Sequence, residues 1–242
     1  MSDMNGKNIN SAIAPPKEVQ AMFDAIAPRY DLLNHLLSFG LDYGWRKKAI
    51  AMLEPKRGGR FLDIAAGSGD MSIEAQRLEP RLVVASDFAE QMLRALQTKL
   101  KKTSSTGVSL ASCDALRLPF PNASFDATMT AFGIRNFSDR LASLKEMRRV
   151  LVPGGIALIL ELTEPKGIFR PLFRIYGRTI LPLLGRIISG SNFAYSYLPA
   201  SIAKFPEAEE FLSLMREAGF KDTMARSLTF GTATIFTGKA EP

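Results

Sequence analysis

Cysteine and histidine are nearly absent from this chain of 242 residues, which has one of each, Cys113 and His35. A single cysteine forms no intramolecular disulfide, and one cysteine with one histidine does not make a Cys/His metal cluster. The sequence therefore predicts no metal site and favours a protein of the reducing cytoplasm. We expect Cys113 to be a small apolar filler, and His35 to have a packing or surface role rather than a catalytic one.

Long apolar runs are also lacking, and none approaches the roughly 20 residues that a membrane-spanning helix needs. Residues 1–14 are polar and rich in Asn and Ser, without the apolar centre of a signal peptide. We expect residues 1–15 to form a flexible arm and residues 16–242 a single domain, because no linker or repeat interrupts them. The net charge of +7 is compatible with binding to nucleic acid, with binding to an anionic membrane, or with solubility alone. The positions of the basic residues along the chain distinguish these three interpretations.

Short apolar segments alternate with helical stretches after residue 60, and three helical stretches precede them. The expected helices are 17–27, 30–37, 45–53, 71–78, 89–100, 139–150 and 205–218. The expected strands are 61–65, 82–87, 108–112, 125–130 and 156–162, followed by a pair at 221–230 and 232–239. This alternation predicts an α/β fold with a doubly wound, mostly parallel sheet, and the final pair predicts an antiparallel hairpin at its edge.

A glycine-rich loop, Gly67-Ser68-Gly69, follows the first expected strand and begins a helix. Glycines there let backbone amides approach a ligand closely, although a Gly-x-Gly sequence alone also fits an ordinary turn. Asp87 ends the second strand, where its carboxylate can accept hydrogen bonds from both hydroxyls of a ribose. Asp114-Ala115 follows the third strand at the same edge of the sheet. Together these residues predict a cofactor that contains a nucleoside.

Carboxylates on either side of the glycine loop, Asp63 and Asp70, distinguish between two classes of cofactor. A dinucleotide would place its pyrophosphate at the helix N-terminus, where these carboxylates would repel it, and the loop has no Lys or Arg. Ser72 stands where the dinucleotide fingerprint has its third glycine. The negative charges instead suit the sulfonium and ammonium groups of S-adenosylmethionine, although Asp70 taken alone also fits a helix cap. We therefore expect S-adenosylmethionine as the methyl donor.

Several longer segments carry a resemblance to one family. They are Met22-Phe-Asp-Ala-Ile-Ala-Pro-Arg-Tyr-Asp-Leu-Leu-Asn34, Phe132-Gly-Ile-Arg-Asn-Phe137, Arg149-Val-Leu-Val-Pro-Gly-Gly155 and Tyr195-Ser-Tyr-Leu-Pro-Ala-Ser-Ile-Ala-Lys-Phe-Pro206. With the glycine loop, they resemble the C-methyltransferases of ubiquinone and menaquinone biosynthesis over nearly the whole chain past its N-terminal arm. The resemblance implies a Rossmann-like class I methyltransferase fold and C-methylation of a prenylated quinol. It also implies that Ser68, Asp87 and Asp114-Ala115 contact the methyl donor.

The chain departs from the family pattern at a few positions. Ala66 stands where the family often has Gly, Ser68 where it has Thr, Asp42-Tyr43 where it has His-Arg, and Ile235-Phe236 in a stretch that usually contains His. A His-based role near the C-terminus is therefore not carried over. The entrance to the substrate pocket is expected to differ from the family at Asp42.

Arg135 and Asn136, which follow the fourth expected strand, are the candidate catalytic residues, together with Tyr30. Methylation of a ring carbon needs an electron-rich ring, so we expect the reduced quinol with one hydroxyl ionised as the reacting form. The fixed positive charge of Arg135 would stabilise that phenolate. A guanidinium holds its proton too tightly to be a base, so a water held by Arg135 and Asn136 is the expected proton acceptor. Tyr30 is expected to close the site. Arg135 also fits a structural clamp, and Tyr30 simple packing.

The segment 165–206 has no acidic residue but several basic ones. Its apolar residues share one face of a helical wheel, and Arg170, Arg174 and Arg178 lie away from that face. The pattern predicts a basic amphipathic helix over 169–188 that docks on an anionic membrane surface, at the inner face of the cell membrane. A helix that only covers the sheet, or roofs a pocket for a prenyl tail, fits the same pattern. The segment is therefore expected to be a lid or a membrane-facing insertion.

The expected reaction is C-methylation of demethylmenaquinol, with a ubiquinol precursor as the nearest alternative. Ring size, tail length and formation of a homo-oligomer leave no signal in the sequence. RNA methylation would use the basic charge, but there is no Asn-Pro-Pro-Tyr segment and no basic patch interleaved with aromatic residues. We therefore expect no nucleic-acid partner. A module that binds the methyl donor without catalysing transfer is the third alternative.

Overall fold

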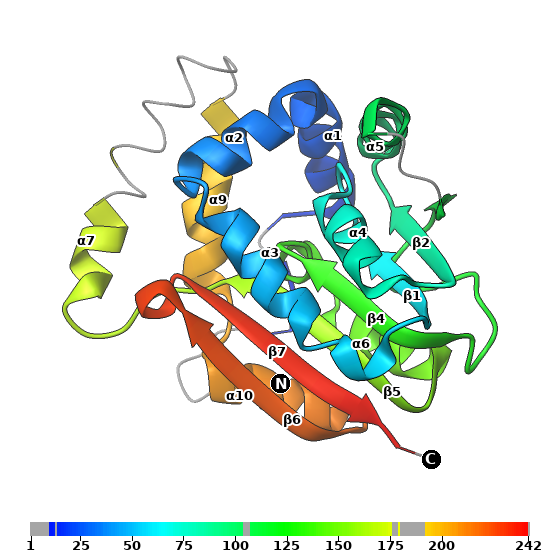
Figure 1. Ribbon diagram of the computed structural model, residues 1–242. Helices are drawn as coiled ribbons and strands as arrows, with labels where there is room; N and C mark the ends of the chain where they lie inside the picture. The colour runs from blue at the N-terminus through cyan, green and yellow to red at the C-terminus, as the bar shows by residue number, and fades with distance from the viewer. Residues whose placement is uncertain (1–9, 13, 104–106, 176–178, 180–191, 242) are drawn as a thin grey trace.

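One sheet, in the order β3-β2-β1-β4-β5-β7-β6, forms the centre of the computed structural model, which describes residues 10–12, 14–103, 107–175, 179 and 192–241 (Figure 1). The strands are β1 (Arg60–Ile64), β2 (Leu82–Asp87), β3 (Val108–Ser112), β4 (Phe125–Ala131), β5 (Leu151–Leu162), β6 (Phe220–Leu228) and β7 (Ala233–Ala240). The first five strands pair in parallel, whereas β7 runs antiparallel to β5 and β6. The predicted doubly wound sheet and its antiparallel C-terminal hairpin are confirmed.

Helices cover both faces of this sheet. They are α1 (Pro16–Ile26), α2 (Tyr30–Leu37), α3 (Leu41–Ala51), α4 (Asp70–Ala75), α5 (Glu90–Thr103), α6 (Arg140–Val150), α7 (Phe169–Ile175), α9 (Asn192–Lys204) and α10 (Ala208–Glu217). Apolar side chains of α3 and α4 pack on one face, and those of α6 and α10 pack on the other. Within β1, Phe61 belongs to the first of these cores and Leu62 to the second, since successive strand residues point to opposite faces. A strand buried on both faces reads as a continuous apolar run, which is the pattern seen in the sequence.

Several boundaries differ from the prediction; the fifth strand, for example, begins at Leu151 and not at residue 156. Two of the differences lie at residues with a left-handed backbone. The third helix begins earlier than expected, at Leu41, directly after Gly40 with φ 73°. The strand expected to reach Phe230 ends at Leu228, because Thr229 and Phe230 have φ 43° and 57° and form a turn. A positive φ is costly for side chains of this size, so these turns interrupt the pattern that the flanking residues set.

Residues 10–12, which end the stretch expected to be a flexible arm, are hydrogen-bonded to the rest of the fold. The Asn10 side chain donates to Oδ1 of Asp139 at 3.0 Å and accepts from the backbone N–H of Leu141 at 2.7 Å. The backbone N–H of Ala12 donates to the carbonyl of Phe137 at 2.9 Å. These bonds join the N-terminal segment to the chain that follows β4. Residues 1–9 lie outside the described part of the chain.

The segment 165–206 is described only at its two ends, by α7 and α9. Most of the expected helix over 169–188, including Arg178 and Arg186, lies outside the described residues. Figure 1 shows α7 standing apart from the sheet, on the same side of the molecule as α2 and α9. No helix among the described residues is both long and apolar enough to cross a membrane.

Candidate active site

A cleft of about 890 Å³, which we call the nucleoside cleft, lies where the parallel strands end. Gly67 after β1, Asp87 at the end of β2, and Asp114 with Ala115 after β3 line it, and α1 covers it with Phe23 and neighbouring side chains. The carboxyl ends of parallel strands share one edge of a sheet, so loops far apart in the sequence meet there. The structure thus brings together four of the residues that the sequence singled out for the cofactor.

Asp87 holds the wall of this cleft in place. Its Oδ2 accepts the backbone N–H of Gly67 at 2.8 Å, and its Oδ1 accepts that of Ala89 at 2.8 Å. Burial raises the pKa of the Asp87 carboxyl above its ordinary value, and the backbone donors oppose that rise. Because each carboxylate oxygen can accept more than one hydrogen bond, Asp87 can still receive the hydroxyls of a ribose. It therefore fixes the glycine loop and faces the ligand with one side chain.

The other two residues of the glycine loop point elsewhere. Ser68 is buried, and its hydroxyl donates to Asp31 of α2. Gly69 has φ 84°, and a Cβ there would lie 2.0 Å from a methyl carbon of Leu96 in α5. Neither residue lines the nucleoside cleft. Gly69 is therefore explained by its packing against α5, and Ser68 by its hydrogen bond to α2. Contacts from Ser68 or Gly69 to the methyl donor stay predictions.

A smaller, polar cavity adjoins the cleft on the other side of the glycine loop. Asp63 lines it, fully buried at the end of β1, with Oδ2 accepting the Ser72 hydroxyl at 2.6 Å. Its Oδ1 has no hydrogen-bond partner. Burial, together with the nearby charge of Asp87, raises the pKa of the Asp63 carboxyl to about 7. The charge of Arg46, which lines the same cavity, opposes this rise, but Asp63 forms no ion pair.

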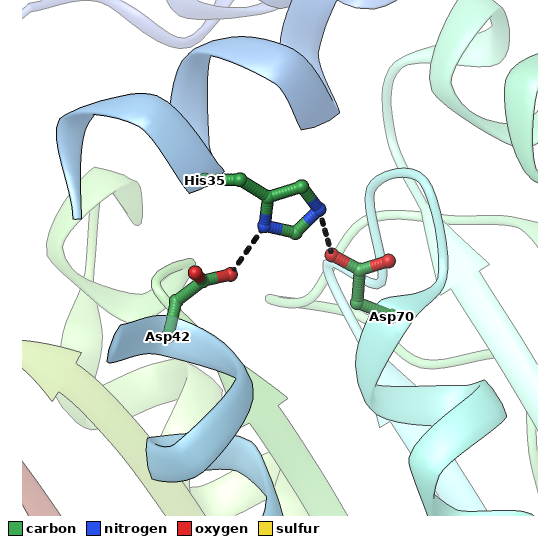
Figure 2. A group of neighbouring side chains, drawn as sticks. All are labelled: His35, Asp42 and Asp70. Atoms are coloured by element: carbon green, nitrogen blue, oxygen red, sulfur yellow. Dashed lines mark hydrogen bonds and ion pairs between the residues drawn. The ribbon is translucent and has the colours of Figure 1, made fainter. Parts of the chain in front are cut away.

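A cluster of charged side chains from α2, α3, α4 and α5 borders the polar cavity, which Arg46 and Asp70 line. His35 lies between Asp42, at 2.8 Å, and Asp70, at 3.8 Å (Figure 2). Arg46 also bonds to both of these carboxylates, and Lys99 bonds to Asp70. The geometry of one histidine and two carboxylates resembles a metal site, but two permanent cations already neutralise it. These ion pairs join α2, α3 and α4 through His35, Arg46 and the two carboxylates.

A third cavity, of about 1300 Å³, is mostly apolar, and we call it the apolar cavity. It is enclosed by α2, α3, α7, α9 and the turn 229–231, with lining residues that include Leu37, Phe39, Trp45, Phe132, Phe169, Leu172, Ile202 and Phe230. The Trp45 indole N–H donates to the Thr229 hydroxyl at 2.8 Å and joins two of its walls. Phe132 lines both this cavity and the nucleoside cleft, so the two meet at that ring.

Arg135 faces the apolar cavity rather than the nucleoside cleft. Its Nη1 donates to Oε1 of Glu161 at 2.7 Å and to the carbonyl of Phe132, and its backbone N–H donates to Oε2 of Glu161 at 3.1 Å. Both side chains are buried, and the Nε–H of Arg135 has no partner. Arg140 fixes the same turn by donating to the carbonyl of Arg135 at 2.8 Å. The expected free positive charge is therefore balanced by Glu161, and what remains for a ligand is an N–H donor.

Asn136 and Tyr30 line the nucleoside cleft, as the sequence predicted for residues near the methyl donor. The Asn136 side-chain oxygen accepts the hydroxyl of Tyr197 at 3.1 Å. Tyr30 also lines the polar cavity, and burial raises the pKa of its phenol above the ordinary value. Tyr30 therefore keeps its proton at neutral pH, which makes it a hydrogen-bond donor and not a base.

Comparison with known proteins agrees with this geometry. The model of the ubiE/COQ5 methyltransferase family matches residues 11–240. The chain belongs to this family. It is 46% identical over 222 residues to the demethylmenaquinone methyltransferase of Deinococcus radiodurans, covering 91% of each chain. It is 44% identical to the ubiquinone/menaquinone biosynthesis C-methyltransferase UbiE of Geobacter sulfurreducens, covering 92% of this chain and 88% of that one.

Solved structures with the same fold are more distant in sequence. The [4+2]-cyclase SpnF superposes with a TM-score of 0.68 at 16% identity, covering 96% of this chain and 99% of that one. A methyltransferase of Thermotoga maritima, described as a possible histamine N-methyltransferase, gives 0.65 at 18% identity, covering 92% and 99%. These likenesses show that the fold is that of the Rossmann-like methyltransferases.

S-adenosylmethionine is the methyl donor of this ubiE/COQ5 family member, and the site fits it. No Lys or Arg among the described residues lines the nucleoside cleft, whereas Asp87 and Asp114 do, which disfavours the phosphates of a dinucleotide. The buried carboxyl of Asp63, whose Oδ1 has no hydrogen-bond partner, suits a positively charged ligand group. The bound donor would supply a methyl group on a positively charged sulfur, and Asp87, Asp114 and Ala115 would hold its adenosine part.

Glu161, Arg46 and Tyr197 are site residues that the sequence analysis missed. Glu161 is the one charged residue in the apolar run 156–162. Because charged residues are rarely buried without a partner, its position in a buried strand could have indicated an ion pair. Arg46 lies on α3, and Tyr197 lies within a segment that carried the family resemblance. Their positions depend on how the helices pack, which no local pattern reveals.

The raised pKa of Asp63 predicts a pH effect on stability in the absence of ligand. Between about pH 4 and pH 7 the folded protein keeps a proton that the unfolded chain releases, so the free energy of unfolding falls as pH rises through this range. Asp63→Asn removes this penalty. Urea denaturation from pH 4 to 9 should find the variant more stable than wild type at pH 8 and similar to it near pH 4. The exposed Asp222→Asn is the control, and equal pH slopes for wild type and Asp63→Asn would contradict the assignment.

Proposed function

We propose that this protein transfers the methyl group of S-adenosylmethionine to a ring carbon of a prenylated quinol, demethylmenaquinol. The observation that carries the proposal is the apolar cavity that meets the nucleoside cleft at Phe132. A methyl donor in the cleft and an apolar ring in the cavity would react across this meeting point. The names of the relatives, which are demethylmenaquinone and ubiquinone/menaquinone methyltransferases, support the same substrate class.

The substrate in this proposal is the reduced quinol. Its ring carbon forms the new bond with the methyl carbon, and the bond from that carbon to sulfur breaks, leaving its electron pair on the sulfur of S-adenosylhomocysteine. The ring then gives the proton at the substituted carbon to water. Electron density at this carbon rises when a neighbouring hydroxyl ionises. The unpartnered Nε–H of Arg135 is a donor to that oxygen from the cavity wall, and Asn136 lies beside it on the cleft side. A preorganised donor in a dry site stabilises developing negative charge more strongly than water does.

Holding the two reactants together accounts for a large part of such a rate enhancement, about 7–11 kcal/mol for well-aligned groups. The walls that do this are fixed by the bonds between Trp45 and Thr229 and between Arg135 and Glu161. Water would compete for the phenolate and weaken every donor aimed at it. The apolar side chains of the cavity exclude that water.

Arg135 can be tested separately from the stability that it provides. Arg135→Gln leaves Glu161 as a buried charge without its cation, at a cost of about 3–5 kcal/mol. The double variant Arg135→Gln/Glu161→Gln removes the pair without that residual charge and should recover most of the stability. We expect its turnover to stay about a hundred-fold below wild type, with affinity for S-adenosylhomocysteine within a few-fold. Stopped assays and calorimetry check this, and wild-type turnover in the double variant would remove Arg135 from catalysis.

The substrate is tested with purified protein, S-adenosylmethionine and chemically reduced quinols that share one prenyl tail. We expect methylated product from the demethylated naphthoquinol, detected by mass spectrometry, and none from the same compound kept oxidised. A benzoquinol of the ubiquinone pathway should react more slowly. Faster reaction with the benzoquinol would assign the protein to the alternative substrate. Methyl transfer to none of the quinols would contradict the proposed function.

We also propose that the enzyme docks reversibly on the cytoplasmic face of the membrane that holds its substrate, through apolar residues around the mouth of the apolar cavity. Phe39, Leu172 and Phe230 line the cavity and are 77%, 63% and 71% exposed, and Ile168 beside them is 80% exposed. Phe39 and Phe230 also have positive φ. Exposed apolar side chains in a strained backbone conformation are typical of a binding surface.

Docking through these apolar residues differs from the docking through basic residues of 169–188 that the sequence predicts. Nε of Arg174 lies 2.6 Å from Oε1 of Glu164, and Nε of Arg170 lies 2.9 Å from Oε2 of the same carboxylate. Glu164 directly precedes the segment without acidic residues, so the count of basic residues overstated its charge. Arg170 and Arg174 therefore have less net attraction to offer an anionic lipid, and apolar insertion carries more of the binding.

The docking proposal predicts that Phe39→Asn/Phe230→Asn abolishes co-sedimentation with phosphatidylglycerol vesicles. Asn tolerates positive φ, so the double variant should fold at least as stably as wild type. Met224→Asn, which removes an exposed apolar side chain from β6, should sediment like wild type. The affinity of the double variant for S-adenosylhomocysteine should match that of wild type, since neither Phe39 nor Phe230 lines the nucleoside cleft. Unchanged sedimentation of the double variant would show that the mouth of the cavity is not the docking surface.

A further inference from the structure

The apolar cavity, which the proposed function assigns to the quinol ring, has few polar side chains in its wall. Apart from Trp45, whose N–H is bonded to Thr229, they are Asn34, Ser38, Asp42, Arg135, Thr229 and Thr232. In a pocket of this kind, a small number of placed polar groups fixes the orientation of a ligand and decides which ligand is accepted. Whether each group donates or accepts a hydrogen bond therefore bears on the chemical form of the ring that binds.

Ser38, which follows α2 and is half-buried, offers the cavity an acceptor. Its hydroxyl donates to Oδ1 of Asp42 at 2.6 Å, whereas the carbonyl of His35, the other acceptor in reach, lies at 3.3 Å. The bond to the carboxylate is the stronger of the two. A serine hydroxyl has one proton, so with that proton directed at Asp42 only oxygen lone pairs are left for a ligand.

Asp42 keeps the Ser38 proton in this direction because it is ionised. The residue is 1% exposed, its Oδ2 accepts from Arg46, and the same oxygen lies 2.8 Å from Nδ1 of His35 (Figure 2). Burial raises the pKa of the Asp42 carboxyl, but Ser38, Arg46 and His35 together hold it below its ordinary value. A carboxylate has no proton to give, so the bond from Ser38 cannot reverse its direction.

Arg135 offers the cavity the opposite kind of group, a donor. Its Nε–H has no partner, and its guanidinium is fixed by a bond to the carbonyl of Phe132. Asp42 is connected to the same residue, because the guanidinium of Arg46, which bonds to Asp42, lies 5.2 Å from the centroid of the Phe132 ring. The acceptor and the donor are therefore both positioned through contacts with Phe132, where the nucleoside cleft and the apolar cavity meet.

We propose that Ser38, oriented by Asp42, accepts a hydrogen bond from the protonated hydroxyl of the quinol while Arg135 donates to the ionised oxygen, and that this pair selects the reduced ring over the oxidised one. A quinol with one ionised hydroxyl matches one acceptor and one donor. A quinone has two carbonyl oxygens, which only accept, and one of them would face the Ser38 oxygen with no proton between them. Two buried acceptors in contact are unfavourable, because both have lost their hydrogen bonds to water.

This inference rests on the proposed function and adds to it a specificity for the redox state of the substrate. The quinone is an electrophile, so its ring cannot attack the methyl group of a sulfonium. A bound quinone would therefore only block the apolar cavity. Selection at Ser38 keeps the cavity available for the form that reacts.

The test uses Trp45, the one tryptophan of the chain, which lines the apolar cavity. Quenching of its fluorescence reports binding without turnover. The full-length protein, saturated with S-adenosylhomocysteine, is titrated under anaerobic conditions with one short-tailed naphthoquinone that lacks the ring methyl group, either oxidised or chemically reduced. Wild type should bind the reduced form about ten- to a hundred-fold more tightly than the oxidised form.

Two variants should bring the two dissociation constants to within a few-fold of each other, by different routes. Ser38→Ala removes the acceptor and should weaken binding of the reduced form. Asp42→Asn should strengthen binding of the oxidised form, because an amide N–H can bond to the Ser38 oxygen and leave the Ser38 proton for a carbonyl. Thr232→Val, which removes a hydroxyl from another wall of the same cavity, is the matched control and should keep the wild-type ratio.

Equal wild-type affinity for the two forms would overturn the inference. Equal weakening of both forms by Ser38→Ala would also overturn it, since Ser38 would then only shape the cavity. Should Asp42→Asn fail to fold, the ratio in Ser38→Ala decides alone. Methylation of the reduced form together with equal affinities would reject this inference and leave the proposed function standing, whereas binding of neither form would contradict both.

Discussion

The buried ion pair between Arg135 and Glu161 is the interaction on which the site depends. It joins the turn after β4 to the end of β5, and the same guanidinium bonds to the carbonyl of Phe132. Phe132 has φ 59°, a conformation that needs such support, and its ring stands where the nucleoside cleft and the apolar cavity meet. Removing one partner of a buried pair leaves an uncompensated charge, so stability and catalytic geometry rest on the same contact.

The N-terminal helices extend this arrangement over the glycine loop. Asp31 of α2 accepts the Ser68 hydroxyl and bonds to Lys99 of α5, and Arg46 of α3 bonds to Asp70 of α4. Asp31, Asp42 and Asp70 each pair with a cation, and these pairs offset the desolvation cost of burying the charges. Asp63 differs from these carboxylates, because it forms no ion pair and its Oδ1 has no hydrogen-bond partner. The charge of Arg46 nevertheless acts on it, so Asp63 and the ion pairs belong to one connected group of charges.

Most of the fold could be predicted from the sequence, because strand and helix periodicity and the glycine loop are local signals. The parallel strands and the convergence of Asp87 with Asp114 followed from the rule that strand ends share an edge. The sequence could not show that Gly69 serves packing against Leu96, or that Glu161 neutralises Arg135, since both contacts join distant segments. For the same reason, the sequence could not show that Arg170 and Arg174 pair with Glu164, which lies just outside the segment 165–206, whereas docking of that segment on an anionic membrane stays a prediction.

Phe132 lines both the nucleoside cleft and the apolar cavity, so the proposed donor and acceptor sites meet at this ring. The most direct measurement is a crystal structure with S-adenosylhomocysteine and a reduced naphthoquinol. We expect the ribose at Asp87 and the quinol ring in the apolar cavity beside Arg135, with its reacting carbon facing the sulfur. A quinol bound elsewhere, or a ribose away from Asp87, would contradict the proposed function.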